Sequence, residues 1–183
     1  ANIYGNQAGG ILKEDTAPAP TNDYAVSKLA TEYVGRLYAN RLPIIVTRPF
    51  NYTGVGQNEK FLIPKIVDHI RQRKTMIELG NLDVARDFSD VRAVVAAYAS
   101  LLTSEVAIGG TYNICSGRAY SLNEIMQMAQ SISGHSIEVT VNPSLVRQNE
   151  VKTLCGDRTK LDRTVPGLPN PTLEETLHWM LQA

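Results

Sequence analysis

The feature of this chain that most limits its fold is the alternation of strand-like and helix-like segments, best seen around residues 44–47. These four residues are a β-branched run, Ile-Ile-Val-Thr, which is typical of a buried parallel strand. The run is followed by Arg48-Pro49-Phe50-Asn51 and then by a loop that carries Gly54 and Gly56. In α/β folds, ligands bind in loops at the carboxyl ends of parallel strands. The sequence therefore predicts an α/β protein with a ligand site near this point.

Other segments follow the same alternation and are bounded by recognisable helix starts. Asn22 can cap a helix over residues 24–40, and Ser121 with Glu124 forms a capping box. Thr172 and Glu175 form a second capping box, which opens a terminal helix. The remaining predicted elements are the end of a strand at residues 1–4, helices at 61–74 and 91–102, and strands at 76–79, 111–115 and 137–141.

Composition narrows the class of protein without identifying it. The 183 residues suit one hydrophobic core, and 18 basic residues balance 18 acidic ones. We therefore expect neither a nucleic acid nor a membrane as a partner, and an N-terminus unlike a signal peptide favours the cytoplasm. Cys115 and Cys155 have no metal-binding spacing and are interpreted as small buried residues. The three histidines are scattered, so we expect no metal site.

A Tyr-x-x-x-Lys sequence lies at the start of the predicted helix over residues 24–40. Tyr24 and Lys28 are four residues apart, so a helix places both side chains on one face. A neighbouring ammonium favours the phenolate form of a tyrosine and makes it a usable proton donor or acceptor near neutral pH. The pair is a short pattern that also arises by chance, so its meaning depends on the surrounding sequence.

The surrounding motifs supply that context, because they occur in one order along residues 1 to about 160. In this order they resemble the extended short-chain dehydrogenases/reductases, the NAD-dependent epimerase/dehydratase family that acts on nucleotide sugars. Within the family, the resemblance is greatest to reductases of GDP-4-keto-6-deoxy-D-mannose. The motifs are Tyr4-Gly5, Tyr24-x-x-x-Lys28, Arg48-Pro49-Phe50-Asn51, Arg86-Asp87-Phe88 and Tyr112-Asn113-Ile114-Cys115-Ser116-Gly117.

The resemblance implies a site for NADP or NAD and for a sugar nucleotide. In the family, the tyrosine that corresponds to Tyr24 protonates the substrate carbonyl, and the lysine that corresponds to Lys28 holds the nicotinamide ribose. Pro49 and Phe50 match the segment that packs on the nicotinamide, although they also suit the end of a strand and a core position. Asn51 matches an asparagine that contacts the sugar nucleotide, or it is an ordinary loop residue.

Three charged residues match substrate contacts of the family. The resemblance places Arg86 and Arg147 on the diphosphate and Glu150 on the nucleotide ribose. Arginine suits this task because its guanidinium binds phosphate oxygens in a bidentate manner. Surface ion pairs are the alternative for all three residues. Asn2 stands where related dehydratases have a glutamate base, which favours a reductase or an epimerase over a dehydratase.

The implied architecture is the C-terminal part of a Rossmann-like doubly wound parallel sheet, with a small α/β substrate lobe. Residues 1–74 are expected to belong to the catalytic domain and residues 75–183 mainly to the lobe, with 91–102 and 111–115 returning to the main sheet. The family's catalytic serine or threonine would directly precede Ala1, and the chain has no G-x-x-G-x-x-G pattern. We therefore expect an open strand edge near residues 44–47 and little NAD(P)H binding by these 183 residues. From about residue 165 the sequence departs from the family, with Pro166 and Pro169 in place of a Leu-Gly-Trp-x-Pro turn.

The reaction implied for the parent protein is the NAD(P)H-dependent reduction of the C4 ketone of GDP-4-keto-6-deoxy-D-mannose to GDP-D-rhamnose, by a homodimer. A nucleotide-sugar 4-epimerase that uses the same Tyr24 and Lys28 is the alternative enzyme. A third hypothesis is that the 183 residues are an inactive fragment that only binds sugar nucleotide or self-associates. The sequence does not distinguish NADH from NADPH, because the selecting residue of the family lies upstream of Ala1.

Overall fold

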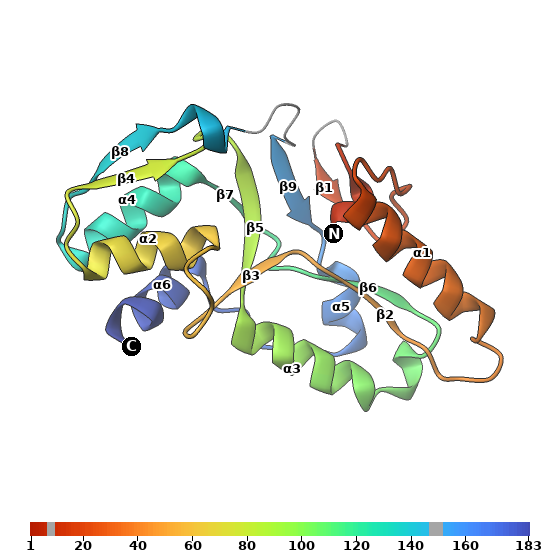
Figure 1. Cartoon of the computed structure of the whole chain (residues 1–183). Helices are drawn as coiled ribbons and strands as arrows, with labels where there is room; N and C mark the ends of the chain where they lie inside the picture. Colours follow the sequence, from red (N-terminus) through yellow and green to blue (C-terminus); the bar gives the residue numbers. More distant parts are fainter. Residues whose placement is uncertain (7–9, 147–151) are drawn as a thin grey trace.

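The computed structural model describes residues 1–6, 10–146 and 152–183 and shows a mixed α/β fold (Figure 1). Parallel strands form its centre, as the alternating sequence predicts, and helices pack around them. The sheet order is β1-β9-β5-β3, with β7 antiparallel to β5; β2 pairs with β6 and β4 with β8. The strands are β1 (Ile11–Leu12), β2 (Val46–Pro49), β3 (Asn51–Thr53), β4 (Met76–Leu79), β5 (Ala85–Asp90), β6 (Thr111–Ile114), β7 (Ala119–Ser121), β8 (Glu138–Val141) and β9 (Thr153–Gly156).

The helices begin close to the residues that the sequence predicts as caps. Asn22 caps α1 by accepting from Ala25 N at 2.9 Å, and the capping boxes at Ser121 and Thr172 open α4 and α6. Short 3-10 turns occupy Asn2–Tyr4, Glu105–Ala107 and Pro143–Leu145. The α-helices are α1 (Asp23–Leu37), α2 (Leu62–Arg71), α3 (Val91–Leu102), α4 (Leu122–Ser133), α5 (Thr159–Thr164) and α6 (Leu173–Gln182).

Three apolar clusters stabilise the described part of the chain. The first joins α2, α4 and α6 to β4 and β7, with Ile66 and Leu177 fully buried at its centre. The second joins α3 to β6 and α5. The third is smaller and lies between the start of the chain and the central strands. In it, the ring centroids of Tyr4 and Phe50 are 6.2 Å apart. Burial of apolar side chains in these clusters is the main force that holds the layers together.

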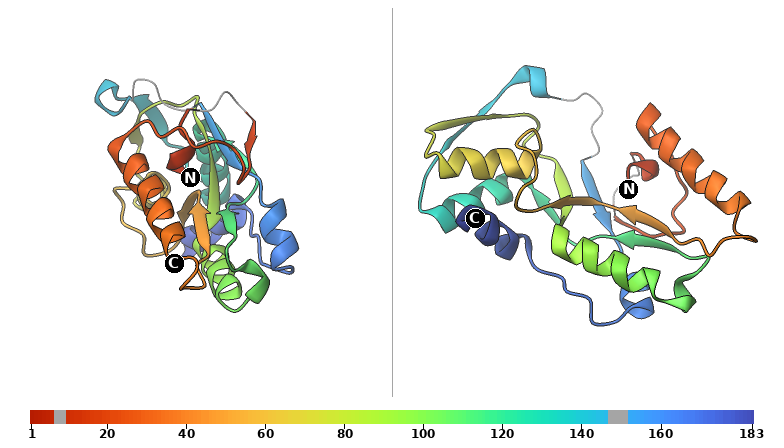
Figure 2. Two further views of the ribbon diagram at one scale, coloured as in Figure 1. Left: turned by 90° about the vertical axis from the view of Figure 1, so that its right-hand side faces the viewer. Right: turned by 60° about the horizontal axis from the view of Figure 1, so that its bottom comes forward.

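Four of the labelled helices lie toward the two ends of the molecule, and α3 and α5 lie along the central strands (Figures 1 and 2). Helices α2, α4 and α6 gather with β4 and β8 at one end, and α1 lies at the opposite end, beyond the central strands. Strands β2 and β3 run between the two ends as one nearly continuous segment. Within the described residues, no helix has the length and apolar character needed to cross a membrane.

The structure confirms most predicted elements and corrects one. Residues 1–4 were expected to end a strand, but Asn2–Tyr4 form a 3-10 turn in which Tyr4 N donates to Ala1 O at 3.0 Å. Gly5 follows with φ of 62°, a conformation that glycine adopts without strain. The run at residues 44–47 forms a strand that is shifted to Val46–Pro49, and among the described strands it pairs with β6 alone. The expected open edge and the division at residue 74 both stay predictions.

Gly156 packs tightly against Cys115 and Phe50 of the third cluster, and this contact generates a test of the fold. A Cβ at Gly156 would lie 2.7 Å from both Cys115 Sγ and Phe50 Cε2. We predict that Gly156→Ala lowers the free energy of unfolding by about 1–3 kcal/mol, because neither neighbour can move freely. Urea denaturation measures this effect. Gly35→Ala is the matched control.

Gly35 lies in helix α1, and a Cβ there would lie 3.9 Å from Ile44 Cγ2, beyond the helix, which is an ordinary van der Waals contact. The control is therefore expected to be neutral or to stabilise by up to about 1 kcal/mol, since alanine favours a helix. Equal stability of the Gly156→Ala protein and the original chain would show that this packing is not as tight as described.

Candidate active site

A cleft of about 720 Å³ runs along α1, β2 and β3 and contains most of the predicted site residues. Its lining includes Tyr24 and Lys28 from α1 and the consecutive residues Pro49, Phe50 and Asn51. These five residues come from segments about 20 positions apart in the sequence, and the fold places them on one surface. Asn2 also lines this cleft.

Tyr24 and Lys28 lie in the first two turns of α1, as their spacing predicts. Lys28 Nζ is 5.4 Å from the centroid of the Tyr24 ring, and 57% of Tyr24 is exposed. The Asn22 cap sets the start of the helix just before Tyr24, which places the phenol at the mouth of the cleft. The geometry supplies an accessible hydroxyl beside a flexible cation.

The segment from Pro49 to Asn51 forms the opposite wall of the cleft. Phe50 is 4% exposed, and its backbone N–H donates to Ile114 O at 2.9 Å. Asn51 Nδ2 donates to Asp87 O at 3.1 Å, which fixes the amide against strand β5. An apolar surface beside a fixed amide can hold the flat face of a ring and one polar substituent.

Arg48 is buried beneath this wall and makes the densest polar contacts near the cleft. Its Nε and Nη2 donate to Glu32 Oε1 and Oε2 at 2.9 and 2.8 Å. Its Nη1 donates to Tyr4 OH and to Glu14 O, both at 2.9 Å. The Tyr4 hydroxyl in turn donates to Asn113 Oδ1 at 2.7 Å. The guanidinium therefore links α1, β2, β6 and the first residues of the chain.

The surroundings of Arg48 and Tyr4 keep the arginine charged and the tyrosine neutral. Burial disfavours the charge of Arg48, but the hydrogen bonds to Glu32 and Tyr4 outweigh burial and raise the pKa of the guanidinium. Burial raises the pKa of Tyr4 above its usual value, with the Arg48 hydrogen bond acting in the opposite direction. Tyr4 therefore acts as a neutral hydrogen-bonding group below the cleft.

Of the three residues predicted to contact the diphosphate or the ribose, the structure describes Arg86. Arg86 is not among the residues that line the cleft, and its Nη1 donates to Ala85 O at 2.9 Å and to Lys152 O at 3.4 Å. Arg147 and Glu150 lie outside the described residues. The proposed contacts of all three with a diphosphate or ribose stay predictions.

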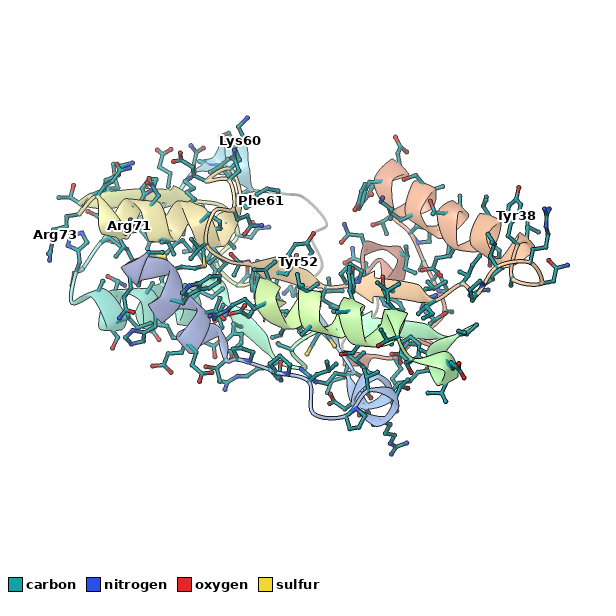
Figure 3. The ribbon with its side chains drawn as sticks, turned by 90° about the horizontal axis from the view of Figure 1, so that it is seen from below. Tyr38, Tyr52, Lys60, Phe61, Arg71 and Arg73 are labelled. Atoms are coloured by element: carbon teal, nitrogen blue, oxygen red, sulfur yellow. The ribbon has the colours of Figure 1, made fainter. Side chains whose placement is uncertain are left out.

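The structure adds cleft residues that the sequence motifs do not reveal. Glu32 lines the cleft from α1, and its position eight residues after Tyr24 is a signal that helical spacing could have supplied. Tyr52 and Phe61 line the distal part and are 46% and 58% exposed. Tyr52 lies on β3, and Lys60 and Phe61 lie at the N-terminal end of α2 (Figure 3). No motif marks them, because exposed aromatic residues are unremarkable in a sequence.

The parallel sheet, the Tyr-x-x-x-Lys helix and the cleft between them define a Rossmann-like fold of the short-chain dehydrogenase/reductase type. The profile of the family described as GDP-mannose 4,6 dehydratase matches residues 1–180. The chain therefore belongs to this family, within the wider group of NAD-dependent epimerases and dehydratases.

Two curated relatives act on GDP-linked deoxy sugars, according to their names. The chain is 39% identical over 161 residues to the GDP-6-deoxy-D-talose 4-dehydrogenase of Aggregatibacter actinomycetemcomitans. This alignment covers 88% of the chain and 54% of the relative. It is 33% identical over 189 residues to the GDP-6-deoxy-D-mannose reductase of Pseudomonas aeruginosa, covering 98% of the chain and 62% of the relative. The chain thus spans just over half the length of these relatives.

Two solved structures show the same fold. One is the crystal structure of a protein of Burkholderia cenocepacia J2315 that is described provisionally as an epimerase; it is 56% identical with a TM-score of 0.96. This match covers 100% of the chain and 60% of the other protein. The other is RMD from Pseudomonas aeruginosa complexed with NADPH, which is 30% identical with a TM-score of 0.89 and covers 99% of the chain and 62% of that protein.

The hydroxyl of Tyr4 offers a direct test of the polar contacts beneath the cleft. We predict that Tyr4→Phe lowers the free energy of unfolding by about 1–3 kcal/mol, because Asn113 Oδ1 and Arg48 Nη1 each lose a buried partner. Chemical denaturation measures this change. Tyr33→Phe is the control, since Tyr33 is 59% exposed, and we expect no effect there. Equal losses in both variants would show that the buried hydroxyl contributes nothing specific.

Proposed function

We propose that this chain is part of an NAD(P)-dependent nucleotide-sugar oxidoreductase that reduces the C4 ketone of GDP-4-keto-6-deoxy-D-mannose to GDP-D-rhamnose. The observation that carries the proposal is the shared cleft, in which Tyr24 and Lys28 face the Pro49–Asn51 segment. The reductase and dehydrogenase names of the two curated relatives support the same class of substrate. Because the chain spans just over half of those relatives, the activity is proposed for the whole protein that contains it.

The described residues suit the nicotinamide end of a dinucleotide. Lys28 supplies an ammonium donor for ribose hydroxyls, and Pro49 with Phe50 supplies an apolar surface for a flat ring. NADPH or NADH, when bound, would supply the hydride. The structure of RMD, which is 30% identical to this chain, was solved in complex with NADPH, and this supports the choice of cofactor.

The role proposed for Tyr24 is to donate its phenolic proton to the C4 oxygen. Its exposed hydroxyl at the mouth of the cleft can reach a bound ketone, and the Lys28 ammonium lies beside the same ring. Asn51 would hold a polar group of the sugar, since its amide is fixed by Asp87 O. Binding of the remote nucleotide would orient C4 toward the reacting groups.

Elimination of water, the reaction of a 4,6-dehydratase, is less well supported. Asn2 lines the cleft at the position where related dehydratases carry a glutamate, and an amide has no carboxylate to remove a proton. A dehydratase name for the family therefore does not decide the reaction of this member.

A 4-epimerase is the second candidate, because the 56% identical structure is described as an epimerase. Both reactions use the same Tyr24 and Lys28. A reductase consumes one equivalent of NAD(P)H for each ketone, whereas an epimerase returns its hydride and leaves the free cofactor unchanged. A third possibility is that the 183 residues by themselves only bind sugar nucleotide or self-associate. Light scattering and cofactor titration on this polypeptide would test that possibility and the predicted homodimer.

The central test is Tyr24→Phe in the protein made from the complete gene. We predict that kcat for reduction of the 4-keto sugar falls by at least about 10²-fold, because the general acid is lost, while NADPH affinity changes little. Tyr33→Phe on the same helix is the control and should keep normal turnover. NADPH consumption and NMR of the sugar product measure rate and configuration at C4.

Near-normal turnover by the Tyr24→Phe protein would contradict the assigned proton donor. Interconversion of nucleotide sugars without net NAD(P)H consumption would favour the epimerase.

Arg86 allows a separate test of substrate binding. We predict that Arg86→Ala in the complete protein weakens binding of GDP by about 1.5–3 kcal/mol, as expected for loss of a charge-assisted hydrogen bond. Isothermal titration calorimetry with GDP measures this change. Arg73→Ala is the control, because Arg73 lies at the far end of α2 from Phe61 (Figure 3). Unchanged GDP affinity in Arg86→Ala would contradict the proposed contact between this guanidinium and the diphosphate.

A further inference from the structure

Helix α1 carries the proposed proton donor, yet apolar packing holds it only weakly. Within α1, all of which the structure describes, Ala25 alone is buried. Leu29 is partly buried against the third cluster, and Tyr33 and Leu37 are 59% and 77% exposed. Apolar contacts are non-directional and here cover few residues. Within the described residues, apolar contacts alone therefore do little to set where this helix lies relative to strand β2.

The ion pair between Glu32 and Arg48 has the geometry for this task. Both oxygens of Glu32 accept from Arg48, at 2.9 and 2.8 Å, so the carboxylate and the guanidinium lie in one bidentate arrangement. The side chains are 10% and 5% exposed, so water screens the pair little. Two parallel hydrogen bonds restrict rotation as well as distance, which a single contact to a lysine would not do.

Each member of the ion pair is close in sequence to residues of the proposed site on its own side of the cleft. Glu32 follows Lys28 by four residues and Tyr24 by eight, so the three lie along one face of α1. Arg48 directly precedes Pro49 and Phe50 on the other wall. A shift of the pair would therefore move the tyrosine relative to the surface proposed to hold the nicotinamide.

Arg48 is itself held by groups outside the cleft. Tyr4 OH and Glu14 O accept from its Nη1. Asn113 N donates to Glu14 Oε1 at 2.8 Å, and Asn113 Nδ2 donates to Leu12 O at 2.9 Å. The guanidinium thus has a fixed position in the sheet, and Glu32 transmits that position to α1.

We propose that Glu32 and Arg48 are positioning residues, which hold Tyr24 and Lys28 in register with the Pro49–Asn51 wall. The consequence for catalysis rests on the proposed reductase function, whereas the effect on the helix does not. A displacement of about 1 Å between reacting groups can lower a rate by about 10²-fold. The pair should therefore affect kcat more than substrate binding.

The test compares two variants of the protein made from the complete gene. Glu32→Gln removes the charge, and the double variant Glu32→Met with Arg48→Met replaces a buried ion pair by apolar side chains, which preserves folding in other proteins. We expect amide hydrogen exchange in residues 23–37 to rise at least about tenfold in both variants, with exchange in α4 unchanged.

In the folded double variant, kcat should fall by about 10²-fold with little change in KM, and the solvent isotope effect should increase because proton transfer becomes slow. Asp162→Asn is the control, since Asp162 forms an exposed ion pair with Arg158 away from this cleft. It should change neither hydrogen exchange in α1 nor kcat.

A folded double variant with the original kcat and isotope effect would overturn the proposal, and so would unchanged hydrogen exchange in α1. If the unmodified protein reduces no 4-keto nucleotide sugar, the reductase function fails, and hydrogen exchange in α1 still decides whether the pair positions the helix.

Discussion

The central strand of the structure depends on one buried carboxylate, that of Asp87. It is fully buried and accepts hydrogen bonds from Ser116 N and Oγ, Gly117 N and Gly156 N, at 2.7 to 3.3 Å. Burial raises the pKa of Asp87, and these hydrogen bonds act in the opposite direction. Since β5 also pairs with β3, β7 and β9, the carboxylate joins this central strand to the segment after β6 and to the end of β9. Asn51 Nδ2 donates to the backbone carbonyl of Asp87, so the same contacts also fix the position of the Asn51 amide.

Much of the helical structure could be predicted from the sequence, because its signals are local. The capping boxes at Ser121 and Thr172 begin α4 and α6 where the side-chain pattern predicts. Helix α1 begins at the predicted Asn22 cap and ends three residues before the predicted end, at Leu37. A capping residue acts on the next three positions, so no knowledge of the fold is needed to place it.

The parts that escaped prediction depend on distant partners. Strand β5 contains Arg86, Asp87, Ser89 and Asp90, a polar run without the apolar alternation of a strand, and its last four residues are nevertheless buried. Family resemblance brought the two walls of the cleft to attention through Tyr24 and Asn51. It did not reveal that Glu32 joins them, since an ion pair across 16 residues leaves no periodic signal in one sequence.

The segment from β2 to β3 changes its partner strand at Phe50. Val46–Pro49 pairs with β6 and Asn51–Thr53 with β5, so the surface proposed for the nicotinamide, Pro49 and Phe50, is followed directly in the chain by Asn51, the amide proposed for the sugar. Adjacent Cα atoms are about 3.8 Å apart whatever the rest of the chain does. Changes of conformation or sequence in the part of the molecule that follows Thr53 therefore leave the spacing of Phe50 and Asn51 unchanged. If the proposed function holds, such a fold can acquire new sugar specificities while the spacing between Phe50, on the proposed cofactor surface, and Asn51, the proposed substrate contact, stays the same.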